Sequence, residues 1–478
     1  MRLSWIKCCI FIICLVLLTG TLLGCSIFTS NYTPVVDGVI DTSKHVRLSM
    51  YLIGPPSSEP AMDYQGIVEE LNESIGDKIN TNVDITFIPL DETDIEYPLI
   101  FNSGAAFDIG YVSTAGEPGF FSLAAEEALL AIDDLLPAYG KGLWEGIAPD
   151  RWEDTKYDGE IYAVPIGGEE YRINGFMFGD DIKHEPEEPI LSIEDMDNYL
   201  DTLAEEDEGK VVADIGEEDA IGLYNMLIDL HKTWIPAPGI PESSLYLVTN
   251  TGGKAGSIMH PAFSREFVEF AEVMKSWSTN GYWQEDVLTA SKDIGYDHNA
   301  GGNVLFFGNF KRFRAIDSKL ADSSHQEGSM LKFIPFCGEG KKIIKAGSAR
   351  NALGISARSK NPERALMLID YIVGSKYSNE ILCYGYEGKI MDYSPFADDP
   401  ANHELLSIKD PFHKFVFDKT PVEKEIDDIL MVNAQYGIPI LLGRAGDPRT
   451  AVNRYRQELE AAGIHRLIDT VKEQLKDF

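Results

Sequence analysis

The sequence predicts an α/β fold, because short apolar strands and amphipathic helices alternate along it. VRLSMYLIG at 46–54, NVDITFIPL at 82–90 and FDIGYV at 107–112 each have the length and apolar content of a buried strand. Between the first two, DYQGIVEELNESIG at 63–76 repeats apolar residues at helical spacing. Strands that alternate with helices are typical of a parallel sheet, so we expect one near the start of the folded region.

The same alternation returns in NALGISARSKNPERALMLIDYIVGS, at 351–375. The segment ALGIS has the pattern of a strand. We expect Asn361 to cap the helix that follows, with Pro362 at its first position. The last stretch, 455–478, has the apolar periodicity of one or two amphipathic helices.

The composition is that of a folded, strongly acidic protein. The chain has 478 residues, which is enough for two or more domains, and 44% of them are hydrophobic and 10% aromatic. Its net charge of -36 opposes binding to nucleic acid and to anionic lipid surfaces, since both are negatively charged themselves. We therefore expect no nucleic-acid partner.

The start of the chain has the pattern of an export signal. Arg2 and Lys7 are its only charges before an uncharged apolar run at 8–23. That run has about the length of a signal-peptide core and is short for a transmembrane helix of ~20 residues. It closes with Leu-Leu-Gly-Cys at 22–25, which resembles the lipobox of bacterial lipoproteins.

This pattern predicts three segments. We expect residues 1–24 to be a cleaved signal peptide, Cys25 to be the site of lipid attachment, and residues 25–44 to form a flexible tether. An uncleaved signal anchor is the alternative. Beyond Cys25 the only cysteines are Cys337 and Cys383, which could pair or remain as two buried free thiols.

Several longer stretches, in this order, are similar to the family 1 extracellular solute-binding proteins, the receptor lipoproteins of ATP-driven importers, mostly for carbohydrates. The stretches are AAFDIGYVSTAGEPGFF (105–121), LLAIDDLLPAYG (129–140), YDGEIYAVPIGGEEYRINGFMFGDDI (157–182), VLFFGNFKRF (304–313), ISARSKNPERALMLIDYIVGSKYSNEILCYGYEGK (355–389) and AAGIHRLIDTVKEQLKDF (461–478). The longest of them resembles the lipoprotein subgroup with an extended C-terminal region. The likeness covers most of the chain and is weakest over 183–260.

The resemblance implies a two-lobed, periplasmic-binding-protein-like fold of type II, with a hinge between two α/β lobes. Lobe 1 would comprise 45–165 and 348–390, and lobe 2 would comprise 166–347 and 391–478. The chain would cross between the lobes near 164–172, near 347–355 and after Gly388.

Ligands of open α/β sheets bind beyond the carboxyl ends of the strands, which draws attention to the loops after FDIGYV and IYAVP. A sugar needs hydrogen-bonding groups for its hydroxyls and flat apolar rings for its C–H faces. From the two loops and from lobe 2 we select as candidate ligand-binding residues Ser113, Thr114, Glu169, Tyr171, Trp234, Trp283 and Asn309.

Each candidate has a structural alternative. Tryptophan and tyrosine commonly pack in cores. Glu169 could pair with Arg172, and Ser113 and Thr114 could cap the next helix.

The resemblance implies an extracytoplasmic, membrane-anchored receptor of an ABC importer that captures a sugar or oligosaccharide and delivers it to a membrane permease. We expect a monomer with no cofactor. The sequence contains no GxSxG, HExxH, P-loop, GxGxxG or EF-hand motif. Two alternatives remain open: a peptide or amino-acid receptor of the same fold, and a lipid-anchored enzyme that processes glycans.

Overall fold

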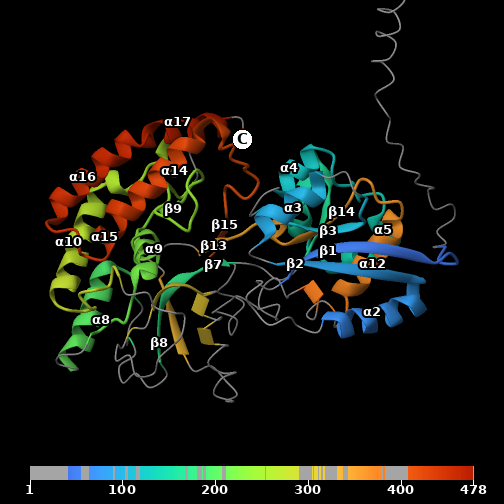
Figure 1. Cartoon of the computed structure of the whole chain (residues 1–478), viewed down its shortest axis with the longest axis horizontal. Helices are drawn as coiled ribbons and strands as arrows, with labels where there is room; N and C mark the ends of the chain where they lie inside the picture. The colour runs from blue at the N-terminus through green and yellow to red at the C-terminus, as the bar shows by residue number, and fades with distance from the viewer. Residues whose placement is uncertain are drawn as a thin grey trace, which may run out of the picture.

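The computed structural model describes most of the chain from residue 41 onward. The residues described are 41–54, 64–89, 92–102, 106–114, 119–166, 171–179, 186, 190–206, 211–252, 255–289, 304, 306–310, 312–313, 316–317, 331–336, 343–375, 377, 381–382, 407–476 and 478. They form two α/β lobes joined by a small central sheet (Figure 1). The predicted leader and Cys25 lie outside these residues, as do Cys337, Cys383 and most of the tether.

Lobe 1 is built on a five-stranded sheet of order β2-β1-β3-β14-β6. Its strands are β1 (Val46–Gly54), β2 (Thr81–Pro89), β3 (Ile109–Val112), β14 (Ala352–Ile355) and β6 (Ala163–Pro165). β1 pairs in parallel with β2 and β3, as the alternation of strands and helices predicts. β14 runs antiparallel to β3 and β6, because the chain re-enters lobe 1 from the side of lobe 2. The sheet is therefore mixed rather than wholly parallel.

Short helices and one hairpin complete lobe 1. They are α2 (Tyr64–Ile79), α3 (Thr93–Asn102), α4 (Phe120–Ala125), α5 (Leu136–Tyr139), α6 (Lys141–Gly146), α7 (Pro149–Asp154), α12 (Pro362–Val373), β4 (Lys156–Tyr157) and β5 (Glu160–Ile161). α12 begins with Pro362, as predicted. Asn361 occupies the position before it, but its side chain makes no capping hydrogen bond, so that part of the prediction is wrong.

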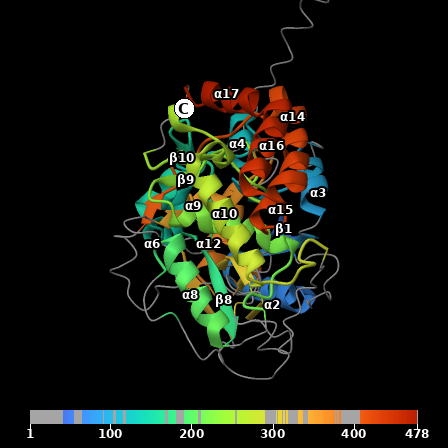
Figure 2. The same ribbon diagram turned by 90° about the vertical axis from the view of Figure 1, so that its left-hand side faces the viewer.

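Lobe 2 combines a three-stranded antiparallel sheet of order β11-β8-β12, a hairpin and a layer of helices. The strands are β8 (Asn174–Gly179), β11 (Phe306–Asn309), β12 (Leu331–Pro335), β9 (Trp234–Pro236) and β10 (Val248–Asn250), and the helices are α8 (Ile193–Glu206), α9 (Ala220–Leu230), α10 (Arg265–Thr279), α14 (Glu423–Val432), α15 (Ile438–Leu441), α16 (Pro448–Ala461) and α17 (Ile464–Gln474). Figure 2 shows α10 and α16 in the helical layer, where they contact each other.

The predicted C-terminal helical region is two helices rather than one. Gly463 separates α16 from α17 with a φ of 91°, a left-handed conformation that side chains with a Cβ rarely adopt. The turn sets α17 against α14, and both helices bury apolar residues in the lobe 2 core. The C-terminal segment is therefore an integral part of lobe 2.

Each lobe has its own hydrophobic core. One cluster joins buried residues between 48 and 166 to residues between 349 and 381. The other joins residues between 176 and 336 to residues between 422 and 471. We keep the division expected from the sequence, 45–165 with 348–390 and 166–347 with 391–478, as our proposal for the lobe boundaries.

A three-stranded sheet of order β15-β13-β7 connects the lobes. Its strands are β7 (Tyr171–Arg172), β13 (Ile343–Lys345) and β15 (Ser407–Lys409), one from each passage of the chain between the lobes (Figure 1). β13 is central, parallel to β15 and antiparallel to β7. We call these three strands the hinge sheet.

Asp154 at the end of α7 ties the hinge sheet to lobe 1. One oxygen of its buried carboxylate forms an ion pair with Lys409 of β15 and lies 3.3 Å from Nε2 of His413, and the other accepts a hydrogen bond of 2.8 Å from the backbone N–H of Ser348. Burial by itself would raise the pKa of Asp154, but these three donors hold it well below its usual value. The carboxylate is therefore ionised in the folded protein.

No helix within the described residues is long and apolar enough to cross a membrane.

We expect Asp154→Asn to destabilise the protein by about 2 kcal/mol, because it removes a buried charge from three donors. The folded-state pKa lies below the unfolded value of 3.8, so this contribution is complete above that pH and is lost as the pH falls through the folded pKa. Thermal unfolding of the wild type and the variant from about pH 2 to pH 7 measures it. Asp84→Asn, which breaks only an exposed pair with Arg47, should cost under about 1 kcal/mol, and an equal cost for both would contradict the prediction.

Candidate functional site

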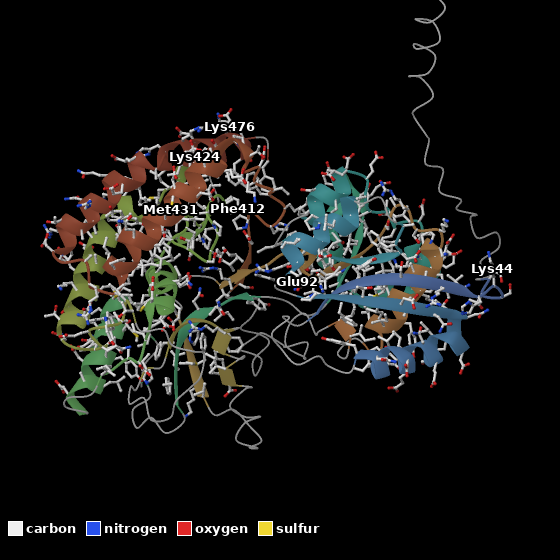
Figure 3. All side chains as sticks on the ribbon, viewed as in Figure 1. Lys44, Glu92, Phe412, Lys424, Met431 and Lys476 are labelled. Atoms are coloured by element: carbon white, nitrogen blue, oxygen red, sulfur yellow. The ribbon has the colours of Figure 1, made fainter. Side chains whose placement is uncertain are left out.

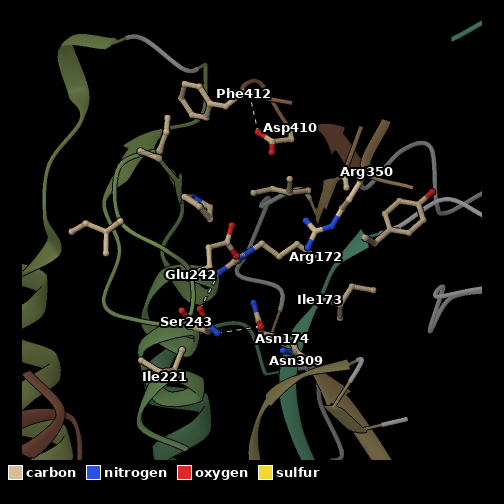
Figure 4. Close-up of a pocket in the computed structure, with 18 of the residues that line it drawn as sticks. Arg172, Ile173, Asn174, Ile221, Glu242, Ser243, Asn309, Arg350, Asp410 and Phe412 are labelled. Atoms are coloured by element: carbon tan, nitrogen blue, oxygen red, sulfur yellow. Dashed lines mark hydrogen bonds and ion pairs between the residues drawn. The ribbon is translucent and has the colours of Figure 1, made fainter. Parts of the chain in front are cut away.

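A cavity of about 600 Å³ lies where the hinge sheet meets lobe 2 (Figure 4). Its walls come from β7, β13, α9, the loop after β9, the start of β8, the end of β11, the Ser348–Arg350 turn and the segment after β15. Its lining residues are Tyr171, Arg172, Ile173, Asn174, Ile221, Asn225, Pro236, Ala237, Pro238, Ile240, Glu242, Ser243, Asn309, Phe310, Ile344, Ala346, Arg350, Asp410, Phe412 and Phe415. We call this space the hinge cavity.

Arg172, the last residue of β7, is the centre of a hydrogen-bond network on one wall. Its guanidinium contacts Glu242 at 2.9 Å, Asp229 at 3.0 Å and Asn225 at 3.0 Å, and it also donates to the hydroxyl of Tyr246. Burial alone would lower the pKa of Arg172, but Tyr246, Asp229 and Glu242 raise it well above its ordinary value. The guanidinium is therefore a permanent charge with balancing carboxylates.

The same network holds Asn174 at the start of β8. Its amide donates to Asp229 at 2.7 Å, and its carbonyl oxygen accepts from Asn225 at 3.3 Å. Asn225 in turn accepts a hydrogen bond of 2.7 Å from Tyr246. Because these buried groups satisfy one another, the wall is rigid and presents its polar atoms in a set arrangement.

Asp410, directly after β15, also lines the cavity. Its Oδ1 accepts a hydrogen bond of 2.8 Å from the backbone N–H of Phe412, which forms a tight turn, and its own N–H donates to Lys345. Its Oδ2 makes no hydrogen bond to any other residue that the structure describes. Figure 4 shows Asp410 and Phe412 side by side at the top of the cavity. The result is a positioned acceptor next to an aromatic ring.

Burial raises the pKa of Asp410 above its ordinary value of 3.8. The N–H of Phe412 opposes this shift, and the negative charge of Glu242 adds to it. Any binding that needs the carboxylate would therefore weaken as the pH falls through this raised pKa.

Two of the residues chosen from the sequence support the turn that carries Arg350. Ser113 donates its hydroxyl hydrogen bond to the carbonyl oxygen of Arg350 at 2.6 Å, and Thr114 donates its backbone N–H to Ala349 at 3.1 Å. Neither lines the hinge cavity. Both lie at the carboxyl end of β3, as expected, and they hold the Ser348–Arg350 turn from which Arg350 reaches the cavity.

The other candidate ligand-binding residues chosen from the sequence lie in different parts of the structure. Tyr171 and Asn309 line the hinge cavity. Trp234 is 5% exposed and stacks on His231, and Trp283 is 1% exposed and donates its indole N–H to Leu442 at 3.1 Å. Both tryptophans lie in the lobe 2 core, so we do not include them in the proposed site. Glu169 lies outside the described residues.

Sequence reasoning missed Asp410, Phe412 and Arg350. The first two lie in DPFHKF at 410–415, where an Asp-Pro pair signals a turn and two aromatic residues follow it. Arg350 is far from Asp410 and Phe412 along the chain, and the hinge sheet brings the two segments together.

The charged residues that line the hinge cavity balance one another, since Arg172 and Arg350 are opposed by Glu242 and Asp410. Aromatic rings stand beside the polar groups at Tyr171, Phe310, Phe412 and Phe415. Rings and hydrogen-bonding groups in one concave space suit a neutral, hydroxyl-rich ligand. Within the part of the chain that the structure describes, no cluster of three or more potential metal ligands occurs.

Comparisons with known proteins agree with this architecture. Residues 411–478 match a domain of unknown function, DUF3502. The whole chain is similar to a protein of Streptococcus pneumoniae serotype 4 (strain ATCC BAA-334 / TIGR4) named carbohydrate ABC transporter substrate-binding protein, with 20% identity over an alignment of 531 positions that covers 99% of each chain.

Two solved structures of the N-glycan transport solute binding protein NgtS from Streptococcus pneumoniae share the fold. One superposes with a TM-score of 0.65 at 18% identity, covering 91% of this chain and 99% of the other. The complex of NgtS with Man5GlcNAc superposes with a TM-score of 0.53 at 19% identity, covering 91% and 98%. These likenesses show that the chain has the two-lobed fold of these proteins.

We expect Tyr246→Phe to cost about 1–2 kcal/mol, because it removes a buried hydroxyl that donates to Asn225 and accepts from Arg172. Urea unfolding monitored by circular dichroism measures the cost. The matched control is Tyr162→Phe, which removes an exposed hydroxyl bonded to Glu160 and should change stability by less than about 0.5 kcal/mol. Equal stabilities of Tyr246→Phe and wild type would contradict the role of this network.

Proposed function

We propose that this protein is the substrate-binding lipoprotein of an ABC importer and that it captures a sugar or oligosaccharide in the hinge cavity. The observation that carries the proposal is the position of Asp410 and Phe412, a directed carboxylate beside an aromatic ring at the junction of two lobes. A sugar ring can rest its C–H face on Phe412 while its hydroxyls donate to the available oxygen of Asp410. Similarity to a named carbohydrate receptor and to NgtS supports the same ligand class.

The arrangement supports a binding protein rather than an enzyme. Of the two carboxylates that line the cavity, Glu242 is engaged in its ion pair with Arg172, which leaves only Asp410 with an oxygen that bonds to no other described residue. A glycosidase needs one carboxyl group free to donate a proton and a second to act as base or nucleophile. We therefore assign the cavity to capture and release, with no cofactor.

The cellular setting follows from the leader. We propose that Cys25 carries the lipid, that the receptor is a monomer on the extracytoplasmic side of the cell membrane, and that it passes its ligand to a membrane permease. The strongly acidic composition suits a soluble body held away from the membrane by its tether.

Binding is tested by thermal shift and calorimetry on residues 26–478, which retain every residue that the structure describes. The probes are maltodextrins, chitin oligosaccharides, Man5GlcNAc and a set of peptides. We expect a glycan at 100 times its Kd to raise the stability by about 2.7 kcal/mol, without being cleaved. A shift with peptides alone, or cleavage of a glycan, would replace this function with one of the alternatives.

Asp410→Asn should weaken binding of that glycan about tenfold or more, because it removes a charged acceptor for the sugar hydroxyls. Asp418→Asn is the matched control, since Asp418 forms the same kind of turn with the N–H of Thr420 outside the cavity. Calorimetric titration of both variants decides the point. Equal affinities of the two variants would remove Asp410 from the site.

Replacement of Cys25 tests the membrane attachment. We expect Cys25→Ser to abolish incorporation of labelled fatty acid and to shift the protein from the membrane fraction to the soluble fraction or the medium. Continued labelling of the variant would show that the lipid is attached elsewhere. Continued membrane retention without labelling would favour an uncleaved signal anchor.

A further inference from the structure

A second cavity, of about 640 Å³, lies between lobe 1 and the segment that follows the hinge sheet. Its lobe 1 wall comes from α4, α7 and the β4–β5 hairpin, and its opposite wall comes from residues 414–416 and the end of α17. The lining residues are Phe121, Ser122, Ala125, Glu153, Lys156, Tyr157, Asp158, Gly159, Lys414, Phe415, Val416, Gln474 and Phe478. We call it the outer cavity.

The outer cavity has firm walls. On the lobe 1 side, Asp158 and Gly159 have φ values of 48° and 88°, so they form the tight two-residue turn typical of Asp-Gly hairpins. That turn sets the ring of Tyr157 at the cavity. On the other side, Gln474 exchanges two hydrogen bonds of 2.9 Å with the backbone of Asp418, which holds α17 against the segment after β15.

Accessible rings are a feature of both walls. Tyr157 is 38% exposed on the lobe 1 side, and Phe478 is 58% exposed on the other, where it packs edge to face against Phe415 at 5.4 Å. The charged residues among the lining balance one another, with Lys156 and Lys414 opposed by Glu153 and Asp158. This combination of rings, polar groups and balanced charge is the one found in the hinge cavity.

The two cavities are neighbours. Phe415 lines both of them, and the turn at 410–416 that places Asp410 and Phe412 in the hinge cavity also places Lys414 and Val416 in the outer one. Figure 3 shows Phe412 on the side of lobe 2 that faces lobe 1. Phe415 and the 410–416 turn therefore form part of the boundary of both cavities.

We propose that the outer cavity is a second carbohydrate subsite, which binds the far end of an oligosaccharide whose first residues occupy the hinge cavity. This inference rests on the proposed function and adds to it that the substrate is a neutral oligosaccharide rather than a monosaccharide or disaccharide. The volume of each cavity exceeds what one sugar ring fills, and the rings at Tyr157 and Phe478 supply stacking surfaces for distal residues.

Calorimetry with ligands of matched chemistry and different length tests the subsite. The probes are maltose and maltohexaose, chitobiose and chitohexaose, and Man5GlcNAc with its mannosyl-N-acetylglucosamine disaccharide. We expect the longer member of the recognised pair to bind about tenfold more tightly than the shorter one. Tyr157→Ala and Phe478→Ala should each remove most of that gain and leave the affinity for the short ligand unchanged.

Trp144→Ala is the control, since Trp144 is a 47% exposed ring of lobe 1 that lines neither cavity. It should leave both affinities unchanged. Equal affinities for short and long ligands, or equal losses for both lengths in the Tyr157 and Phe478 variants, would overturn the subsite and leave the hinge cavity intact as the binding site. Failure of every glycan to bind would overturn the proposed function together with the subsite.

Discussion

The hinge sheet is the constraint on which the rest of the structure depends. Three passages of chain leave one hydrophobic core and enter the other, and β7, β13 and β15 pair their backbones at that point. The pairing satisfies backbone groups in all three passages at once and sets the distance between the lobes. Asp154 adds a buried charge that joins lobe 1 to Lys409 at the end of β15. Residues from both lobes thus reach a common space because three short strands run side by side.

The hinge cavity follows directly from this pairing. Arg172 is the last residue of β7, Asp410 comes directly after β15, and Arg350 lies in the turn between β13 and β14. The Arg172 network satisfies its own hydrogen bonds and so gives a rigid wall, whereas one oxygen of Asp410 bonds to no other residue that the structure describes. A receptor that must bind and release the same molecule needs such a division, because a wall that reorganised on binding would reduce the affinity. In our proposal, the outer cavity offers the same combination of rings and polar groups to the distal residues of a longer ligand.

The sequence predicts the regular elements well and the site only in part. Runs rich in apolar residues identify β1, β2 and β3 to within a few residues, because the positions of a strand that face the core must be apolar. The strands of the hinge sheet have two or three residues each, too few to show any periodicity. The direction of β14 depends on the side from which the chain re-enters lobe 1, and the topology of the whole chain sets that side. Of the residues chosen from the sequence, Tyr171 and Asn309 line the hinge cavity. Trp234 and Trp283 instead pack in the core, because an aromatic ring suits a core as well as a sugar-binding surface. Asp410 is visible in the sequence only as part of a turn, and its role depends on the pairing of β15 with β13.

The most direct test of the account is a crystal structure of residues 26–478 grown with the glycan that stabilises the protein most. The account predicts a sugar ring against Phe412 in the hinge cavity, with a hydroxyl within hydrogen-bond distance of Asp410 and with the Arg172 network unchanged. A glycan bound at a site that shares no residue with the hinge cavity would contradict it.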